Sequence, residues 1–248
     1  IMQNLNKNYW IVGKHAVKEA LNNTQREKIR FCLAKDVIFK HNIKNLTSEI
    51  LSREQISNII GNSISHQGIA LQVKPLKKVN IIEFLKKTKN KKNIIIVLDQ
   101  ITDVQNIGAI IRSAQAFSAN AIICQEKNSP KENTLLSRAA AGALEFIPII
   151  YVKNISQTLK LLKENNYWSI GLDGKSKYSL KDISKNNNNF FDNNIAVVMG
   201  SEGKGIRNLV TKNCDMCCKI NIKDTIDSLN VSVALAIALY EITRSQKF

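Results

Sequence analysis

Three short stretches of the sequence carry polar side chains that could act together on a substrate. Asn106 and Arg112 lie in one apolar segment, Glu202 lies in a glycine-rich loop, and Ser228 and Asn230 precede a second apolar segment. A carboxylate, a guanidinium group, two amides and a hydroxyl can bind a polar substrate and stabilise charge on it. Each stretch alone has an ordinary structural explanation, since Asn and Ser cap helices and glycine-rich loops form tight turns.

The first stretch predicts a helix over Asn106–Phe117, with Asn106 as its N-cap. Arg112 would then lie in the second helical turn. An arginine near the positive end of a helix gains nothing from the helix dipole. That placement favours an external anion such as a phosphate as its partner, and a surface salt bridge is the alternative.

The second stretch is the loop Gly200–Gly205, which directly follows a predicted strand. Glycines there let the backbone approach a ligand closely. The spacing matches neither the dinucleotide fingerprint GxGxxG nor a P-loop. The loop alone therefore fits a tight turn as well as a binding site, and Glu202 is either a solvated turn residue or a site carboxylate.

Taken together, the stretches resemble the motifs of the SpoU (TrmH) family of SPOUT RNA 2'-O-ribose methyltransferases. The motif-like segments are Asp103–Ala114, Val198–Gly203 and Ser228–Ala234. Val12–Val17 and His66–Ile69 resemble the flanking domain of the RlmB-type subgroup, which methylates a guanosine of large-subunit (23S) ribosomal RNA.

The resemblance implies S-adenosylmethionine as the cofactor, RNA as the partner and no metal. It assigns to the reaction site Asn106, Arg112, Glu202, Ser228 and Asn230. It assigns to the cofactor site Met199, Gly200, Gly203, Ile220, Ile222, Leu229 and Asn230.

From residue 93 onward, apolar runs alternate with helix-like segments, which predicts an α/β fold with a mostly parallel sheet covered on both faces. The strands are expected at Ile94–Leu98, Ala121–Cys124, Pro148–Val152, Trp168–Leu172, Ile195–Met199 and Cys217–Ile222. A further helix is expected over Leu135–Leu144. The resemblance adds that the sheet is Rossmann-like and ends in a carboxyl-terminal trefoil knot, a topology that is otherwise nearly absent.

A lysine-rich connection predicts the domain organisation. Residues 1–75 read as a small α/β module, residues 76–92 as a linker, and residues 93–248 as the methyltransferase domain. The module is predicted to contain strands at Ile29–Ala34 and Ile69–Val73 and helices around Ala16–Leu21 and Leu46–Leu51. By the resemblance, it recognises RNA.

The last predicted helix, Asn230–Thr243, is apolar nearly all the way round. Such a helix needs burial on every side. Deep burial within one domain and contact with a second subunit both satisfy that need. The resemblance implies a homodimer whose sites form at the subunit interface.

Composition bounds the class of protein. The chain has 248 residues, of which 44% are hydrophobic, so it can form a sizeable core. Its formal net charge of +16 favours a polyanionic partner, and a basic surface without a special partner is the alternative. No apolar stretch approaches the ~20 residues that cross a bilayer. We expect a soluble protein without membrane contact.

The five cysteines fit no even disulfide framework, which favours a reducing compartment such as the cytoplasm. The pair Cys214 and Cys217 has no second pair beside it. We interpret these cysteines as small buried side chains, with a metal or redox site as the alternative.

The leading interpretation is methylation of a guanosine ribose in 23S ribosomal RNA. The alternatives are a tRNA 2'-O-ribose methyltransferase and a non-catalytic RNA-binding factor of ribosome assembly. A nucleotide-dependent oxidoreductase is disfavoured because the fingerprint glycines are missing.

Overall fold

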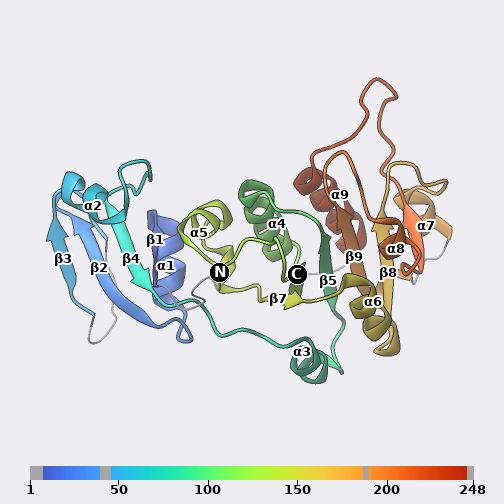
Figure 1. The fold of residues 1–248 in the computed structure, drawn as a ribbon, viewed down its shortest axis with the longest axis horizontal. Helices are drawn as coiled ribbons and strands as arrows, with labels where there is room; N and C mark the ends of the chain where they lie inside the picture. Colours follow the sequence, from blue (N-terminus) through green and yellow to red (C-terminus); the bar gives the residue numbers. More distant parts are fainter. Residues whose placement is uncertain (1–7, 40–45, 187–189, 245–248) are drawn as a thin grey trace. The chain divides into compact units, whose positions relative to one another are not determined.

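The protein is described here by a computed structural model that covers residues 8–39, 46–186 and 190–244, with the backbone alone for 184–186. By its internal contacts the chain divides into two compact units (Figure 1). The first unit comprises Ile1–Lys77 and Lys131–Phe146, and the second comprises Lys78–Pro130 and Ile147–Phe248. Each unit contains its own sheet and its own core.

The first unit is built on a four-stranded sheet with the order β1-β4-β2-β3. Its strands are β1 (Tyr9–Val12), β2 (Lys28–Ala34), β3 (Ser48–Leu51) and β4 (Ile69–Val73), and its first two helices are α1 (Lys14–Asn22) and α2 (Arg53–Ile60). Helix α1 buries the apolar positions that predicted it, namely Ala16, Val17, Ala20 and Leu21. The predicted strands at β2 and β4 are confirmed as well.

The prediction of a helix around Leu46–Leu51 is wrong, because Ser48–Leu51 forms strand β3, which pairs in parallel with β2. Helix α2 begins only after Ser52. The Ser52 hydroxyl accepts a hydrogen bond from the Gln55 amide at 3.1 Å, and the Gln55 side chain accepts one from the Ser52 amide at 2.7 Å. This capping box is a sequence signal that fixes the start of the helix about two turns later than the apolar spacing suggests.

The segment Lys131–Phe146 belongs to the first unit although both its neighbours in sequence belong to the second. It contains α5 (Thr134–Ala140) and a short 3-10 helix, η1 (Ala143–Glu145). The sequence predicts one continuous helix here. The chain instead turns at Ala141 and Gly142, whose φ angles are +48° and +92°, and this left-handed pair ends α5.

A buried arginine attaches this segment to the rest of the first unit. The side chain of Arg26 has 0% exposure and forms ion pairs with Glu132 and Glu145. Its Nε donates to Glu145 Oε2 at 3.0 Å, its Nη2 donates to Glu145 Oε1 at 2.7 Å, and its Nη1 also donates to the Lys74 carbonyl at 2.9 Å. The guanidinium carbon lies 5.8 Å from the centre of the Tyr9 ring. Burial raises the pKa of the Tyr9 hydroxyl far above its usual value.

The second unit contains a six-stranded sheet with the order β10-β8-β9-β5-β6-β7, and all its strand pairs are parallel. The strands are β5 (Ile94–Asp99), β6 (Ala121–Gln125), β7 (Ile149–Val152), β8 (Tyr167–Leu172), β9 (Asn194–Gly200) and β10 (Met216–Cys218). The predicted parallel α/β sheet is confirmed. The last strand is shorter than predicted, because the chain leaves the sheet after Cys218.

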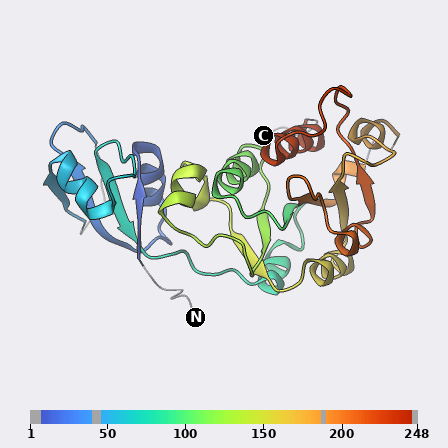
Figure 2. The ribbon, with the colours of Figure 1, turned by 45° about the horizontal axis from the view of Figure 1, so that its top comes forward.

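Helices cover both faces of this sheet. They are α3 (Ile81–Thr88), α4 (Val104–Ala116), α6 (Ile155–Glu164), α7 (Leu180–Asn186), α8 (Asn208–Thr211) and α9 (Val231–Thr243), with a 3-10 helix η2 at Phe190–Asp192. Figures 1 and 2 show α4 and α9 on one face and α3 and α6 on the other. Since all six strands run in the same direction, their carboxyl ends line one edge of the sheet. Among the described residues, no helix combines the length and apolar character that a membrane crossing requires.

The buried arginine of the first unit generates a stability prediction. Arg26→Met leaves the carboxylates of Glu132 and Glu145 without their partner, which we expect to lower the free energy of unfolding of this unit by about 3–5 kcal/mol. In a Trp168→Phe background, Trp10 is the remaining tryptophan and reports on this unit during urea unfolding.

The matched control is Arg53→Met, which removes an exposed ion pair with Asp36 and is expected to cost at most ~1 kcal/mol. Equal losses in the two variants would contradict the role assigned to Arg26.

Candidate active site

Helix α4 begins at the carboxyl edge of the sheet, and its start differs from the predicted one. Asp103, not Asn106, is the N-cap, and its carboxylate accepts from the Asn106 amide at 2.7 Å. Asn106 is therefore the third helical residue, and its side chain is free for contacts outside the helix. Arg112 consequently lies in the third turn rather than the second. The Asp at the cap was present in the sequence, but Asn106 fits the same role by residue type.

Three of the predicted reaction-site residues meet in a hydrogen-bonded cluster, although they are far apart in sequence. Asn230 Nδ2 donates to Asn106 Oδ1 and to Glu202 Oε1, both at 2.9 Å. Asn106 Nδ2 donates to the same Glu202 oxygen at 3.1 Å. The Glu202 carboxylate is thus held by two amides from two different helices.

Asn230 has a second role as the N-cap of α9. Its Oδ1 accepts from the Ser232 amide at 2.9 Å and from the Ser232 hydroxyl at 2.6 Å. The amide nitrogen and oxygen of one side chain thus serve the cluster and the helix end, respectively. Because α4 and α9 also pack against each other, their starts are fixed side by side.

The glycine loop positions Glu202 by closing tightly on itself. The Gly205 amide donates to the Ser201 carbonyl at 2.8 Å. A Cβ on Gly200 would lie 2.1 Å from the carbonyl carbon of Gly205, so only glycine fits at the end of β9. Gly203 and Gly205 have φ angles of +79° and +66°. The structure thus shows the tight turn, and the role of Glu202 as a site carboxylate stays a prediction.

A buried ion pair that the sequence analysis missed anchors the end of this loop. Asp99 is fully buried at the end of β5 and accepts from the Arg207 amide at 2.9 Å. Arg207 Nε and Nη2 donate to the other carboxylate oxygen at 2.9 and 2.6 Å. An Asp directly after an apolar strand was the available signal, because a charge at that position needs a buried partner.

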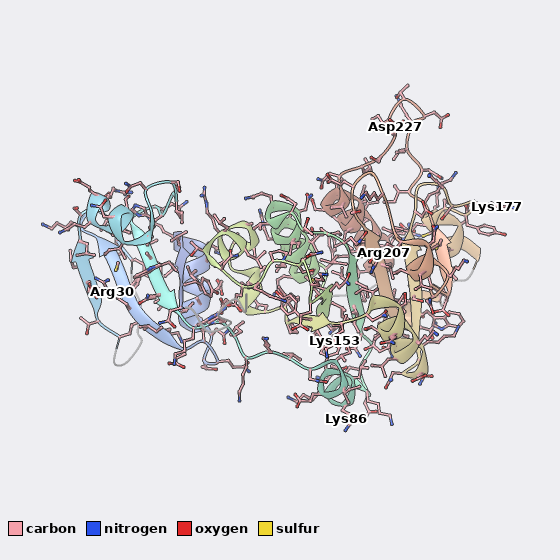
Figure 3. The ribbon with its side chains drawn as sticks, in the orientation of Figure 1. Arg30, Lys86, Lys153, Lys177, Arg207 and Asp227 are labelled. Atoms are coloured by element: carbon pink, nitrogen blue, oxygen red, sulfur yellow. The ribbon has the colours of Figure 1, made fainter. Side chains whose placement is uncertain are left out.

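The loop after β10 offers backbone groups that could hold a cofactor. Residues 219–230 leave the sheet as a long loop, with Asp227 labelled at its tip in Figure 3. In the described part of the chain, no hydrogen bond uses the backbone groups of Ile220, Ile222 or Leu229. Together with the Gly200 turn, such free amides and carbonyls fit the binding of S-adenosylmethionine through its adenine and amino-acid groups.

The structure does not bring the two other predicted reaction-site residues into the cluster. Arg112 and Ser228 are both exposed. No hydrogen bond or ion pair joins either of them to another residue that the structure describes. Both side chains are thus available to a ligand. Met199 is buried in β9, directly before the glycine loop.

The cysteines of this unit are shielded thiols. Burial and the neighbouring Cys217 raise the pKa of Cys214 to about 12, and burial raises the pKa of Cys218 to about 12. Thiols with such pKa values are poorly ionised at neutral pH and react slowly. Within residues 8–39, 46–186 and 190–244, no three His, Cys, Asp or Glu side chains form a group suited to a metal ion.

Two protein-family profiles match this chain, one in each of its two parts. The profile described as "SpoU rRNA Methylase family" matches residues 93–240, and the profile described as "RNA 2'-O ribose methyltransferase substrate binding" matches residues 10–79. A "Putative TrmH family tRNA/rRNA methyltransferase" of Staphylococcus epidermidis is 33% identical over 245 residues, which cover 95% of each chain.

Solved structures share the fold. An rRNA methyltransferase of Sinorhizobium meliloti with bound AdoMet superposes with a TM-score of 0.79 at 17% identity, covering 97% of this chain and 88% of that one. A TrmH/SpoU tRNA-modifying enzyme of A. aeolicus superposes with a TM-score of 0.54 at 23% identity, covering 66% of this chain and 83% of that one. The first likeness confirms the predicted SPOUT-type fold.

The double role of Asn230 can be separated by two substitutions. Asn230→Asp keeps the cap but removes the amide donor and places a second carboxyl beside Glu202. The resulting repulsion raises the carboxyl pKa values. Because both side chains are exposed, we expect a loss of about 1 kcal/mol near neutral pH that shrinks as the pH falls below about 5.

Asn230→Ala is the comparison variant. It loses the cap as well, at a cost of roughly 1 kcal/mol that does not depend on pH. Urea unfolding followed by Trp168 fluorescence in a Trp10→Phe background measures both variants. The same pH profile in both would contradict the carboxylate contact.

Proposed function

Because the chain belongs to the SpoU rRNA methylase family, whose members are RNA 2'-O-ribose methyltransferases using S-adenosylmethionine, we propose that its substrate is a guanosine ribose of large-subunit (23S) ribosomal RNA. The observation that carries the proposal is the cluster of Asn106, Glu202 and Asn230 beside the free backbone groups of the loop after β10. This cluster supports a reaction site of polar side chains, to which Asn230 connects the loop of the proposed cofactor site.

In the proposed reaction the cofactor supplies the methyl group, and the protein binds and aligns the two reactants. S-adenosylmethionine supplies an electrophilic methyl group on its sulfonium. Met199, Gly200, Gly203, Ile220, Ile222, Leu229 and Asn230 are the residues proposed to hold it. The protein must align a ribose oxygen with that methyl and stabilise the charge that develops on the oxygen, and alignment alone supplies several kcal/mol.

Arg112 is proposed to bind a phosphate of the RNA and to stabilise the developing alkoxide. It is exposed and its fork of N–H donors matches a phosphate. A guanidinium stays protonated in proteins and is a poor base, so the hydroxyl proton passes to a phosphate oxygen or to water. Glu202, held by its two amides, is proposed to orient the RNA, or Arg112 once RNA is bound, and Ser228 is proposed to line the same site.

Two observations favour ribosomal RNA over tRNA. The S. meliloti structure, which is named an rRNA methyltransferase, matches 97% of this chain, whereas the A. aeolicus tRNA-modifying enzyme matches 66%. A substrate-binding profile also covers residues 10–79, so the module of residues 1–75 is proposed to recognise RNA. Residues 76–92 are proposed as the linker and 93–248 as the catalytic domain, and within it the segment Lys131–Phe146 packs with the first unit. The net charge of +16 suits a polyanion.

The protein is further proposed to act as a homodimer in the cytoplasm, with a trefoil knot at its carboxyl end. Helix α9 buries one side in the unit, but Val233, Ile237 and Tyr240 on its other side are 48%, 40% and 59% exposed. An apolar stripe of this kind suits a subunit interface. The free cysteines suit a reducing compartment.

Arg112→Lys tests the role of the arginine. Lysine keeps the charge but lacks the fork of donors, so we expect methyl transfer to fall on the order of 100-fold while S-adenosylmethionine binding stays unchanged. Methylation assays and calorimetry measure the two quantities. Near-normal turnover would show that neither a fork-shaped clamp nor an arginine base is needed.

The substrate is identified by nucleoside mass spectrometry of ribosomal RNA and tRNA from cells with and without the gene. We expect one 2'-O-methylguanosine to disappear from the 23S fraction alone. Loss from tRNA would support the tRNA alternative. No loss, together with no heat on titration with S-adenosylmethionine, would support a non-catalytic assembly factor.

A further inference from the structure

A cavity of about 440 Å³ lies in the second unit, away from the cluster of Asn106, Glu202 and Asn230. It opens where α3 and α6 begin and where β6 and β7 end. We call it the α3–α6 cavity, and the side chains that matter here are those of Lys78, Asn80, Tyr151, Lys153, Asn154 and Gln157. Its volume falls within the range of small-ligand sites.

Several polar groups around this cavity have no partner among the residues that the structure describes. Lys78 and Lys153 are exposed, and neither forms an ion pair with a described residue. Asn80 and Asn154 cap their helices through Oδ1, at 2.8 and 3.1 Å, so their amide nitrogens remain available. Gln157 likewise forms no side-chain hydrogen bond within the described residues. The lining thus offers two cations and a set of amides that can pair with the edge of a base.

The remaining lining suits a flat, partly apolar ligand group. Tyr151 presents a half-buried ring, and its hydroxyl donates to the Pro130 carbonyl at 2.8 Å, which fixes the ring. Aromatic side chains of this kind stack on bases of single-stranded RNA. Glu126 also lines the cavity and would repel a phosphate near it, but it already interacts with another group of the protein.

The cavity and the cluster lie at the same edge of the sheet. The glycine loop follows β9 and the cavity follows β7, and these strands are separated by β5 and β6. Three strand spacings correspond to about 14 Å along the edge, a span of a few nucleotides. One single strand of RNA can therefore pass the cluster and reach the cavity.

We propose that the α3–α6 cavity binds one nucleotide of the substrate RNA near the methylated ribose, with its phosphate between Lys78 and Lys153 and its base against Tyr151 and the amides. This rests on the proposed function, since it requires that RNA occupies the edge of the sheet. The cavity thereby contributes to the choice of target sequence, in addition to the amino-terminal module.

The test measures binding of a short single-stranded oligouridylate to the full chain by fluorescence anisotropy, without methyl transfer. Lys153→Ala combined with Gln157→Ala is expected to weaken binding about tenfold or more. The slope of log affinity against log salt should fall by about 0.7 for the lost lysine contact. Ultraviolet cross-linking of the oligouridylate should label the peptide that contains Tyr151.

The matched control is Lys86→Ala, which removes the same charge from the far end of α3 (Figure 3). This variant should change the affinity for the oligouridylate by at most about twofold, because Lys86 would contribute only to the overall electrostatic potential of the protein. Equal losses in the double variant and the control, or no binding of the probe by the unaltered chain, would overturn the proposal. Calorimetry with S-adenosylmethionine checks that each variant is folded. The proposed function is tested separately, by mass spectrometry of the methylated nucleoside in cells with and without the gene.

Discussion

The candidate site depends on one buried charge. Asp99 ends β5 without any exposure, and a carboxylate there is tolerated only because Arg207 binds both of its oxygens. Arg207 lies just beyond the glycine loop, so this ion pair fixes one end of the loop while β9 fixes the other. Only a loop held at both ends can present Glu202 at a constant position to the two helices that reach it.

Helix starts then complete the arrangement. Asn106 and Asn230 sit in the first turn of α4 and at the cap of α9, where backbone and side-chain hydrogen bonds restrict their rotamers. The packing of α4 against α9 brings the two starts together, and the parallel sheet sets both at its carboxyl edge. The side chains of Asn106, Glu202 and Asn230 are therefore positioned by helix starts and by a tight loop. This limits the reorganisation that is needed when a substrate binds.

Much of this could be read from the sequence, because buried parallel strands and the three polar stretches leave strong local signals. The apolar patterns alone were enough to predict strand β5 and helix α9. The wrong or missing predictions depended on contacts between residues far apart in the sequence, or on two nearby residues that could each cap the same helix. Ser48–Leu51 became a strand because β2 offered an open edge, and the partner of Asp99 lay more than a hundred residues away. Arg112 was placed one turn early because Asp103 rather than Asn106 caps α4.

The membership of Lys131–Phe146 in the first unit has a practical consequence for dissecting the protein. The chain passes between the two units three times, so they cannot be separated by a single cut at the linker. A fragment that begins at residue 78 would keep α5 but lack Arg26 and the apolar surface beneath Leu136 and Ala140. It would carry exposed apolar side chains and two orphaned glutamates, and its insolubility would say nothing about the folding of its sheet.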